Sequence, residues 1–361
     1  MKTCRVVVAL PVKDEAERIA ACLDALNQQD ITADLTIFVL VNNASDESAA
    51  IARRHPVRAV VQEVELADPD ASAGGARRLA MHHAAELAGD DGVVLTTDAD
   101  GRVARDWLRC NLLAIAAGAD AVAGRAVIDP IDEARIPLAL RAADARECHY
   151  ATLLDEISAA IDPDPADPWP RHDEHSGASI AVTVDALHRA GGVPALPLGE
   201  DRAFFDSLRR IDARIRHAPD VCVTVSGRTD GRAQGGMADT IRRRLVCPDV
   251  FLDDRLEPAR DAEQRARLRR RARLAWAESV LDYWAILALA RDLRLPAAFV
   301  HEKLASRRFG AAWDELQDAS PALRRRSVPA AAIAHEIAVA TAILADPTSA
   351  TACNQAIGMS A

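Results

Sequence analysis

Apolar runs and helix-patterned segments alternate along the first hundred residues. The runs at 5–10 (RVVVAL) and 35–41 (LTIFVLV) contain no polar alternation, which is typical of strands covered on both faces. Further strands are expected at 57–64 and 92–97, and helical segments begin near residues 14, 49 and 74. This order predicts an α/β fold, with a mostly parallel sheet flanked by helices.

The later part of the chain is patterned less regularly. We expect strands at 119–128, 178–184 and 215–225, and helices at 136–161, 185–190 and 202–211. Residues 162–177 are rich in Pro and Asp and are expected to form a loop. From about Met237 the pattern is wholly helical, so we predict a first domain at 1–235 and a helical C-terminal region at 236–361.

Three of the predicted strands end in polar clusters. They are Pro11-Val-Lys13-Asp-Glu15, Asn42-Asn43 and Asp98-Ala-Asp100. In open α/β sheets, ligands bind beyond the carboxyl ends of the strands. We therefore expect these clusters to converge on one pocket.

Asp98 and Asp100 lie one residue apart, directly after a buried strand. In an extended chain, such side chains point to the same side, and two carboxylates at one point repel unless they share a proton or a cation. A hard divalent ion that also binds phosphate oxygens, Mg²⁺ or Mn²⁺, would resolve the repulsion. The alternative is a surface turn, because Asp and Gly are common turn residues.

Composition narrows the class of protein. The chain has 361 residues, is 50% hydrophobic and carries a net charge of -10, which supports a sizeable core and argues against a nucleic-acid partner. Its seven cysteines are scattered without a CxxC pair, as expected of reduced thiols in a cytoplasmic protein. No stretch reaches the roughly 20 apolar residues of a membrane span.

Five motifs in order resemble the family-2 glycosyltransferases of the GT-A fold. They are VVVALPVKDEAERIAACLDAL, LVNNASDES, GGARRLAMHHA, TTDADGRVARDWL and HSGASIAVTVDALHRAGGVPALPLGEDRAFF, and they run from about Arg5 to Gly227. The resemblance implies a GT-A domain with a helical C-terminal extension. It also implies a nucleoside diphosphate sugar as donor and Mg²⁺ or Mn²⁺ as cofactor, and it favours the metal over the turn at Asp98 and Asp100.

Each motif contributes residues to the implied site. The expected contacts to base, ribose and diphosphate are Pro11, Glu15, Asn42, Asn43, Arg77, Arg78 and Asp98. Asp100 would hold the metal with help from Asp98, and His217 is a candidate third ligand, although a lone His before a strand is more often structural. Asp201 is the candidate general base, with Glu200 as base or as an orienting residue. Taken alone, the two acids would be read as helix N-terminal charges.

Departures from the family pattern refine the expected reaction. Asn42 stands where the family most often has Asp, Ser179 stands where Asn is common, and the Gln/Arg-x-x-Arg-Trp motif of processive synthases is missing. We therefore expect a single, inverting transfer to a hydroxyl of a small-molecule or lipid-linked acceptor. UDP is expected over GDP because UDP-sugars are the more frequent donors.

Two other functions stay open at this point. DADG after an apolar strand also resembles the first motif of haloacid-dehalogenase-type phosphatases, with Asp98 as nucleophile, and a sugar-nucleotide-binding protein without activity is the second alternative. The arginine run at 264–276 could attract an anionic acceptor or membrane surface, although the solvated face of a C-terminal helix is the favoured interpretation. The helical tail leaves open a homodimer and a peripheral membrane contact.

Overall fold

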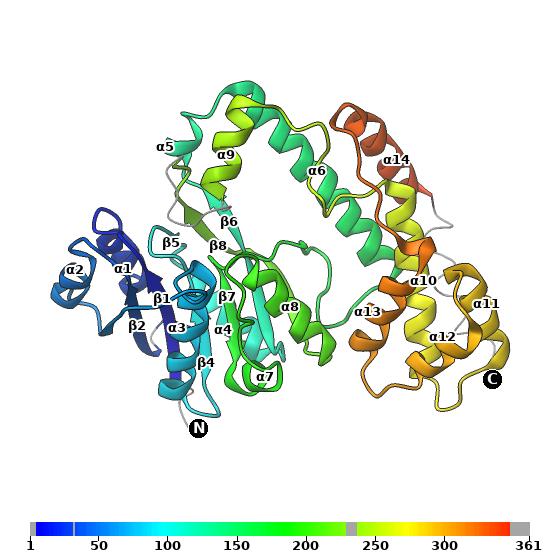
Figure 1. Cartoon of the computed structure of the whole chain (residues 1–361), viewed down its shortest axis with the longest axis horizontal. Coiled ribbons are helices and arrows are strands. Elements are labelled where there is room, and N and C mark those ends of the chain that lie inside the picture. The colour runs from blue at the N-terminus through cyan, green and yellow to red at the C-terminus, as the bar shows by residue number, and fades with distance from the viewer. Residues whose placement is uncertain (1–4, 32, 229–236, 347–361) are drawn as a thin grey trace. The chain divides into compact units, whose positions relative to one another are not determined.

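The computed structural model describes residues 5–31, 33–228 and 237–346 of the chain. Their strands form one eight-stranded sheet in the order β3-β2-β1-β4-β7-β6-β8-β5 (Figure 1). The strands are β1 (Arg5–Val12), β2 (Asp34–Asn42), β3 (Ala59–Val64), β4 (Val93–Thr96), β5 (Arg102–Val103), β6 (Ala121–Ile128), β7 (Ile180–Thr183) and β8 (Ile215–Val225). The α/β fold expected from the sequence is confirmed.

Strand direction divides the sheet into two parts. The strands β3, β2, β1 and β4 run parallel, whereas β7 pairs antiparallel with both β4 and β6. β8 runs parallel to β6 and antiparallel to β5, which makes the sheet mixed. The chain adds β2 and β3 on one side of β1 and then β4 on the other, so the carboxyl ends of β1 and β4 flank the point where the strand order reverses. Ligands bind at such a point in open α/β sheets.

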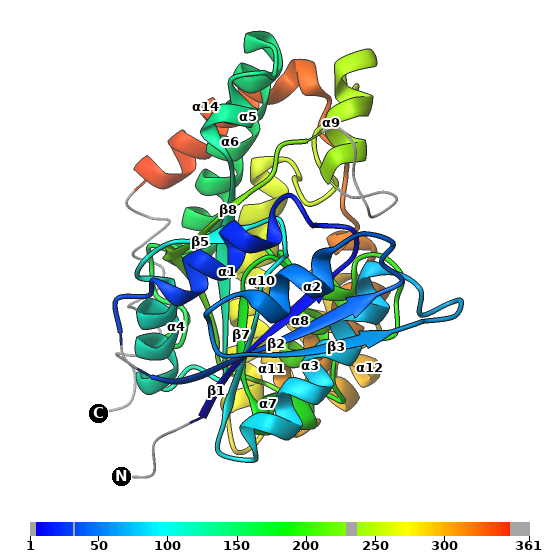
Figure 2. The same ribbon diagram turned by 90° about the vertical axis from the view of Figure 1, so that its left-hand side faces the viewer.

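Helices cover both faces of the parallel strands (Figure 2). The helices of the unit that contains the sheet are α1 (Ile19–Asn27), α2 (Ser48–Arg54), α3 (Ala73–Ala88), α4 (Trp107–Ala116), α5 (Pro130–Glu133), α7 (Val184–Arg189), α8 (Glu200–Arg210) and α9 (Met237–Val246). In β1, Val6, Val8 and Leu10 share a buried cluster with residues of α1, α2 and α4. The alternate residues Val7 and Ala9 point to the other face, where α3 contacts β1. Burial on both sides explains the uninterrupted apolar run of β1.

The described residues divide into two compact units. The first contains the sheet and takes residues within 1–137, 174–209 and 213–246. The second takes residues within 138–173, 210–212 and 247–361. The segment 138–173 is therefore grouped with the C-terminal helices and α9 with the sheet, while the domain boundary at 235 stays a prediction.

The second unit is helical. Its elements are α6 (Leu138–Ile161), α10 (Ala259–Ala277), α11 (Tyr283–Leu293), α12 (Ala297–Leu304), α13 (Phe309–Ala319), α14 (Ile333–Ala345) and two short 3₁₀ turns, η1 (Pro321–Leu323) and η2 (Ala330–Ala332). Buried side chains of α6, α10 and α14 form one cluster, and those of α10 to α13 form another. Among the described helices, none combines the length and apolarity that crossing a membrane would require.

The arginine run of α10 serves this helical unit. Asp162 is almost fully buried and binds Arg269 and Arg273, with 2.9 Å from Arg273 Nε to Asp162 Oδ1. Arg265 donates two bonds of 2.8 Å to the buried Glu257. These three arginines therefore neutralise acids of their own unit. Neither hypothesis for the arginine run, attraction of an anionic surface or a solvated helix face, included such internal pairs.

Asp155 gives the helical unit a pH-dependent stability. Burial, followed by the charge of Asp173, raises the pKa of the Asp155 carboxyl well above its usual range, and Arg171 and Arg255 oppose this only in part. The folded state therefore keeps a proton that the unfolded chain releases near pH 4. Stability contributed by this proton is present in acid and is lost as the pH rises toward neutrality.

We expect Asp155→Asn to gain stability relative to the wild type as the pH rises, because asparagine keeps a neutral side chain at every pH. The measurement is the free energy of unfolding of both proteins in urea, near pH 4.5 and near pH 7.5. Parallel pH dependence of the two proteins would show that Asp155 is ionised in the folded state.

Candidate functional site

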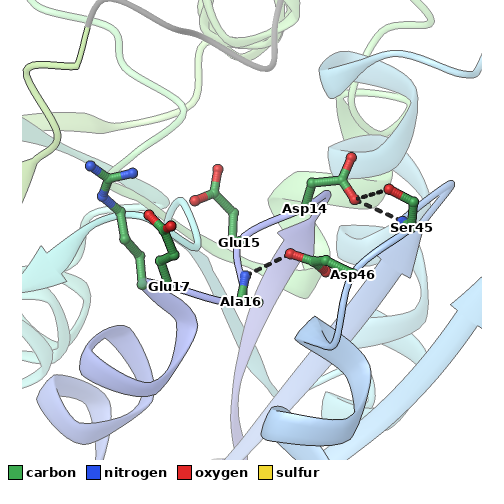
Figure 3. A pocket seen from close by; sticks show the side chains of 7 residues that line it. Asp14, Glu15, Ala16, Glu17, Ser45 and Asp46 are labelled. Atoms are coloured by element: carbon green, nitrogen blue, oxygen red, sulfur yellow. Dashed lines mark hydrogen bonds between the residues drawn. The ribbon is translucent and has the colours of Figure 1, made fainter.

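The ends of β1 and β2 are joined by hydrogen bonds between the segments that follow them (Figure 3). Asp14 Oδ1 accepts from Ser45 N at 2.7 Å and from Ser45 Oγ at 3.1 Å, and Ala16 N donates to Asp46 Oδ2 at 2.8 Å. These segments line a pocket of about 410 Å³ whose walls also include Glu15, Glu17 and Arg18. The first two polar clusters of the sequence thus lie at one edge of the sheet, as predicted.

The residues expected to contact base and ribose differ in their burial and in the hydrogen bonds they already make. Pro11 is half-buried near the end of β1, and Asn42 is buried at the end of β2. Asn43 has a left-handed backbone with φ of +47°, and its amide accepts from Leu66 N at 3.1 Å and donates to Leu66 O at 2.9 Å. The Asn43 side chain therefore fastens the end of β2 to the segment after β3.

Glu15 and Asp100 share a guanidinium that the sequence had not indicated. Both carboxylate oxygens of Glu15 accept from Arg228, with 2.9 Å between Oε2 and Nη1. Arg228 Nη2 also lies 3.2 Å from Asp100 Oδ2. Burial, followed by the charge of Asp98, raises the pKa of Asp100 to about 6 despite this arginine. The three carboxylates therefore form one site of high negative charge.

The Asp98-Ala-Asp100 segment is a turn as well as part of this site. Gly101 N donates to Asp98 O at 3.0 Å directly after β4 has ended. The buried thiol of Cys22 lies behind the turn and donates to Asp98 O at 3.6 Å. Burial, followed by the charges of Asp100, Asp98 and Glu15, raises the pKa of this thiol. The segment is thus a turn, as one interpretation of the sequence expected, and its role in holding a metal stays a prediction.

Arg77 links Asp98 to the acceptor-side motif. It lies on α3, is buried, and donates to Asp98 Oδ1 at 2.7 Å and to Glu200 Oε1 at 3.0 Å. Its Nη1 also donates to Thr96 Oγ1 at 3.1 Å and to the carbonyl of Gly177 at 2.7 Å. Burial alone would lower the pKa of the guanidinium, but the charges of Asp98 and Glu200 outweigh it and raise the pKa. Arg77 is therefore a fixed, charged bridge.

Gly177 completes the bridge on the other side. Its N–H donates to Asp201 Oδ2 at 2.9 Å, while its carbonyl accepts from Arg77. A Cβ at this position would lie 2.5 Å from the Arg77 guanidinium carbon, so only glycine admits the contact. The half-buried Asp201 accepts its second bond from Arg202 N at 2.8 Å. Asp98 and Asp201 are thus connected through one guanidinium and one glycine.

Two predicted residues lie apart from this arrangement. Arg78 donates to Asp70 at 2.8 Å and is part of a half-exposed pair next to α3. His217 lies near the start of β8, where its Nε2 is 3.0 Å from His175 Nε2. It lies seven positions before Thr224, which pairs with Arg102 beside the aspartates. Its role as a third metal ligand stays a prediction.

The carboxylates fit a hard divalent cation. Their free donors are oxygen atoms, the ligands that Mg²⁺ and Mn²⁺ prefer, and one or two carboxylates suffice when substrate phosphates supply the rest. A positive guanidinium already bridges Glu15 and Asp100, so the group is arranged to pair with positive charge. Asp98 Oδ1 is taken by Arg77, so its other oxygen is the one that remains for an ion.

Sequence reasoning missed Arg228 and the role of Gly177. Arg228 follows the last strand of the matched motifs, and the antiparallel pairing of β5 with β8 brings it to Asp100. The two residues of β5 give too short a pattern to predict that pairing. Gly177 stands inside a recognised motif, but a backbone carbonyl leaves no signal in a sequence.

We expect Arg77→Met to lower the free energy of unfolding by about 3–5 kcal/mol, because it leaves the buried Glu200, and with it the half-exposed Asp98, without their cation. The matched control is Arg78→Met, the next residue, whose half-exposed pair should contribute less than about 1 kcal/mol. Urea denaturation measures both. The double variant Arg77→Met with Glu200→Gln should recover part of the loss, and equal costs for the two single variants would contradict the bridge.

Comparisons with known proteins give one family match and several similar solved structures. Residues 7–177 match the sequence model of glycosyl transferase family 2, a range that includes the first four polar and glycine-rich motifs. No curated protein matches the chain. Among solved structures, a mannosyltransferase from Pyrobaculum calidifontis in complex with GDP-Man and Mn²⁺ is 20% identical, with a TM-score of 0.43 and coverage of 96% of this chain and 83% of that one.

Two further structures are similar at the same level. S. aureus TarS 1-349 in complex with UDP-GlcNAc is 14% identical over 88% of this chain and 92% of that one, with a TM-score of 0.45. The glucosyl-3-phosphoglycerate synthase of Mycobacterium tuberculosis is 19% identical over 69% and 82%, with a TM-score of 0.36. Likeness at this level says nothing of the substrates of this chain. The family match does confirm the expected class: the chain carries a glycosyl transferase family 2 domain and is a glycosyltransferase.

Proposed function

We propose that this glycosyltransferase moves a sugar from a nucleoside diphosphate donor to a hydroxyl acceptor with inversion, in a single transfer that depends on a divalent metal. The observation that carries the proposal is the connection from Asp98 through Arg77 and Gly177 to Asp201. It holds a carboxylate suited to the donor side and a carboxylate suited to the acceptor side within one rigid frame.

The donor is proposed to enter the pocket between the ends of β1 and β2. Base and ribose would lie against Pro11 and Asn42, with the diphosphate directed toward Asp98 and Asp100. The 410 Å³ of the pocket supports this placement, because ligand pockets commonly range from about 300 to 1,000 Å³. UDP remains the expected nucleotide, with GDP as the alternative. Asn43 is a weaker candidate for a nucleotide contact than the sequence suggested, because its side-chain amide is hydrogen-bonded to the backbone of Leu66.

Asp100 and the free oxygen of Asp98 would hold Mg²⁺ or Mn²⁺. Such an ion, when bound, offsets the charge that grows on the departing diphosphate. His217 is not needed for this role, since phosphate oxygens and water complete the coordination of these ions.

Asp201 is the proposed general base. A carboxylate oxygen of Asp201 would take the proton of the acceptor hydroxyl while the hydroxyl oxygen bonds to the anomeric carbon. The bond from the anomeric carbon to the diphosphate oxygen breaks, and its electron pair leaves with the nucleotide. Glu200 is unsuited to this step because it is buried and paired with Arg77, so we assign it the positioning of that arginine.

The phosphatase alternative receives no support. The family match includes the Asp98 segment, and Asp98 Oδ1 is held by Arg77, which would weaken it as a nucleophile. A binding protein without activity would not require the acceptor-side Asp201 to be connected to Asp98. The chemical type of acceptor, a homodimer and a peripheral membrane contact remain predictions. A cytoplasmic location is supported by the five described cysteines, which are all free thiols.

The donor can be identified without knowing the acceptor. A thermal-shift panel of UDP-, GDP-, CMP- and dTDP-sugars, each with and without Mn²⁺, should raise the melting temperature only for the true donor and more strongly with the metal, because a ligand that binds the folded state stabilises it. Stabilisation by a sugar nucleotide that is the same with and without the metal would contradict the proposed cofactor.

Asp201→Asn should lower kcat for sugar transfer by about 10²–10⁴-fold, the range that a general base contributes. Its affinity for the donor, measured by calorimetry, should stay near that of the wild type. Asp206→Asn is the matched control, since Asp206 lies on the same helix and pairs with the surface residue Arg209. Normal turnover of Asp201→Asn would remove the residue from the mechanism.

A further inference from the structure

The guanidinium of Arg228 occupies the place beside Asp100 that the proposed reaction assigns to the divalent metal. Its guanidinium binds both oxygens of Glu15 and approaches Asp100 Oδ2 to 3.2 Å. Its side chain is 16% exposed, against 7% for Glu15 and 19% for Asp100, so the group is largely removed from water. The carboxylate proposed to hold the metal is therefore already paired with a positive charge of the chain itself.

The backbone beside Arg228 is anchored. Gly227 N donates to Asp132 Oδ2 at 3.0 Å, and Arg228 N donates to Ser226 Oγ at 3.2 Å. This fixes the backbone that carries the arginine at the end of β8, beside the aspartates. The Arg228 guanidinium can then leave the carboxylates by a movement of its side chain alone.

The pair lies between two hollows. Glu15 lines the 410 Å³ pocket proposed for the nucleotide, and Asp100 lines a smaller one of about 70 Å³ with Asp129 and Asp132. Arg18 lines both. Each of the two carboxylates that Arg228 approaches therefore borders a hollow.

Two cations cannot share these carboxylates without repelling each other. Replacing the guanidinium by Mg²⁺ or Mn²⁺ exposes a buried arginine to the loss of its partners, which is costly unless a new anion accepts it. A diphosphate is such an anion, because phosphate oxygens match the fork of a guanidinium.

We propose that Arg228 is an internal competitor of the divalent metal, holding Glu15 and Asp100 while the donor is absent and passing to the diphosphate when it arrives. The inference rests on the proposed function. Metal and nucleotide then bind cooperatively, since each removes a cost that the other would meet alone, and this coupling is reciprocal. The enzyme keeps its metal site closed to free ions until a diphosphate is present.

The experiment is a titration of the full-length protein with Mn²⁺, followed by electron paramagnetic resonance, without acceptor and thus without transfer. In the absence of nucleotide, Arg228→Gln should bind Mn²⁺ at least about 10-fold more tightly than the wild type, which corresponds to about 1.4 kcal/mol. Addition of UDP or GDP should tighten Mn²⁺ binding strongly in the wild type and less in the variant.

The control is Arg109→Gln, which removes the same charge from a surface arginine paired with Asp30. It should bind Mn²⁺ as the wild type does. Arg228→Lys keeps a positive charge but lacks the fork, so an intermediate affinity is expected, and it tests the inference if Arg228→Gln does not fold. Equal Mn²⁺ affinities of the wild type and the Arg228 variants would overturn the inference.

A further variant separates this failure from failure of the proposed function. In the Arg228→Gln background, Asp100→Asn should remove the gain in Mn²⁺ affinity. If the gain persists in the double variant, the ion binds elsewhere and the proposed metal site is wrong. If the single variant shows no gain while Asp100→Asn still weakens nucleotide-dependent Mn²⁺ binding in the wild-type background, the metal site stands and the role of Arg228 falls.

Discussion

Negative charge at one edge of the sheet is the constraint on which the rest of this structure depends. Glu15, Asp98, Asp100 and Glu200 come from distant parts of the sequence and meet beyond the ends of parallel strands, where little water remains to screen them. Two arginines compensate them in different ways. Arg77 is buried and hydrogen-bonded to four partners, which suits a permanent link, whereas Arg228 follows β8 and binds Glu15, a residue of the pocket proposed for the nucleotide.

The fold supplies this constraint through its strand order. β1 lies between β2 and β4, so the segments after these strands are forced to the same place. The segment that carries Gly177 leads into β7, which pairs antiparallel with β4, and so approaches the end where the aspartates lie. The topology therefore places the residues proposed for the donor next to those proposed for the acceptor, whatever their side chains are.

Sequence patterns predicted the elements well where one physical signal dominated. The buried runs of β1 and β2, and β8 at 215–225, were predicted because apolar length and β-branching agree. α4 was missed because its start follows the turn and the short β5 without a clear cap, and Asp106 makes no side-chain cap bond. The partition into units could not be predicted, since α6 is separated from its partners α10 and α14 by the whole acceptor-side motif.

Within the site, the sequence identified which carboxylates matter but not how they are paired. Asp98 and Glu200 were named for separate roles, and only the three-dimensional arrangement shows that Arg77 holds both. Patterns of spacing report residues on one element, whereas this pairing joins positions 123 apart. His217 was proposed as a ligand from its place in the motif order; the structure adds that it lies beside His175 and Phe205, and the ligand role stays a prediction.

The discontinuous make-up of the helical unit bears on how the enzyme can be dissected. Tyr150, Leu153 and Ile157 of α6 are buried by residues that arrive more than a hundred positions later, and the Tyr150 hydroxyl donates to the carbonyl of Glu257 at 2.7 Å. A chain cut after the family motifs would keep α6 but lose the helices that bury it, so the apolar side chains of α6 would be exposed to water. The tail is thus no detachable appendage, and shortened versions intended for crystallisation or engineering should end only where both halves of that shared core survive.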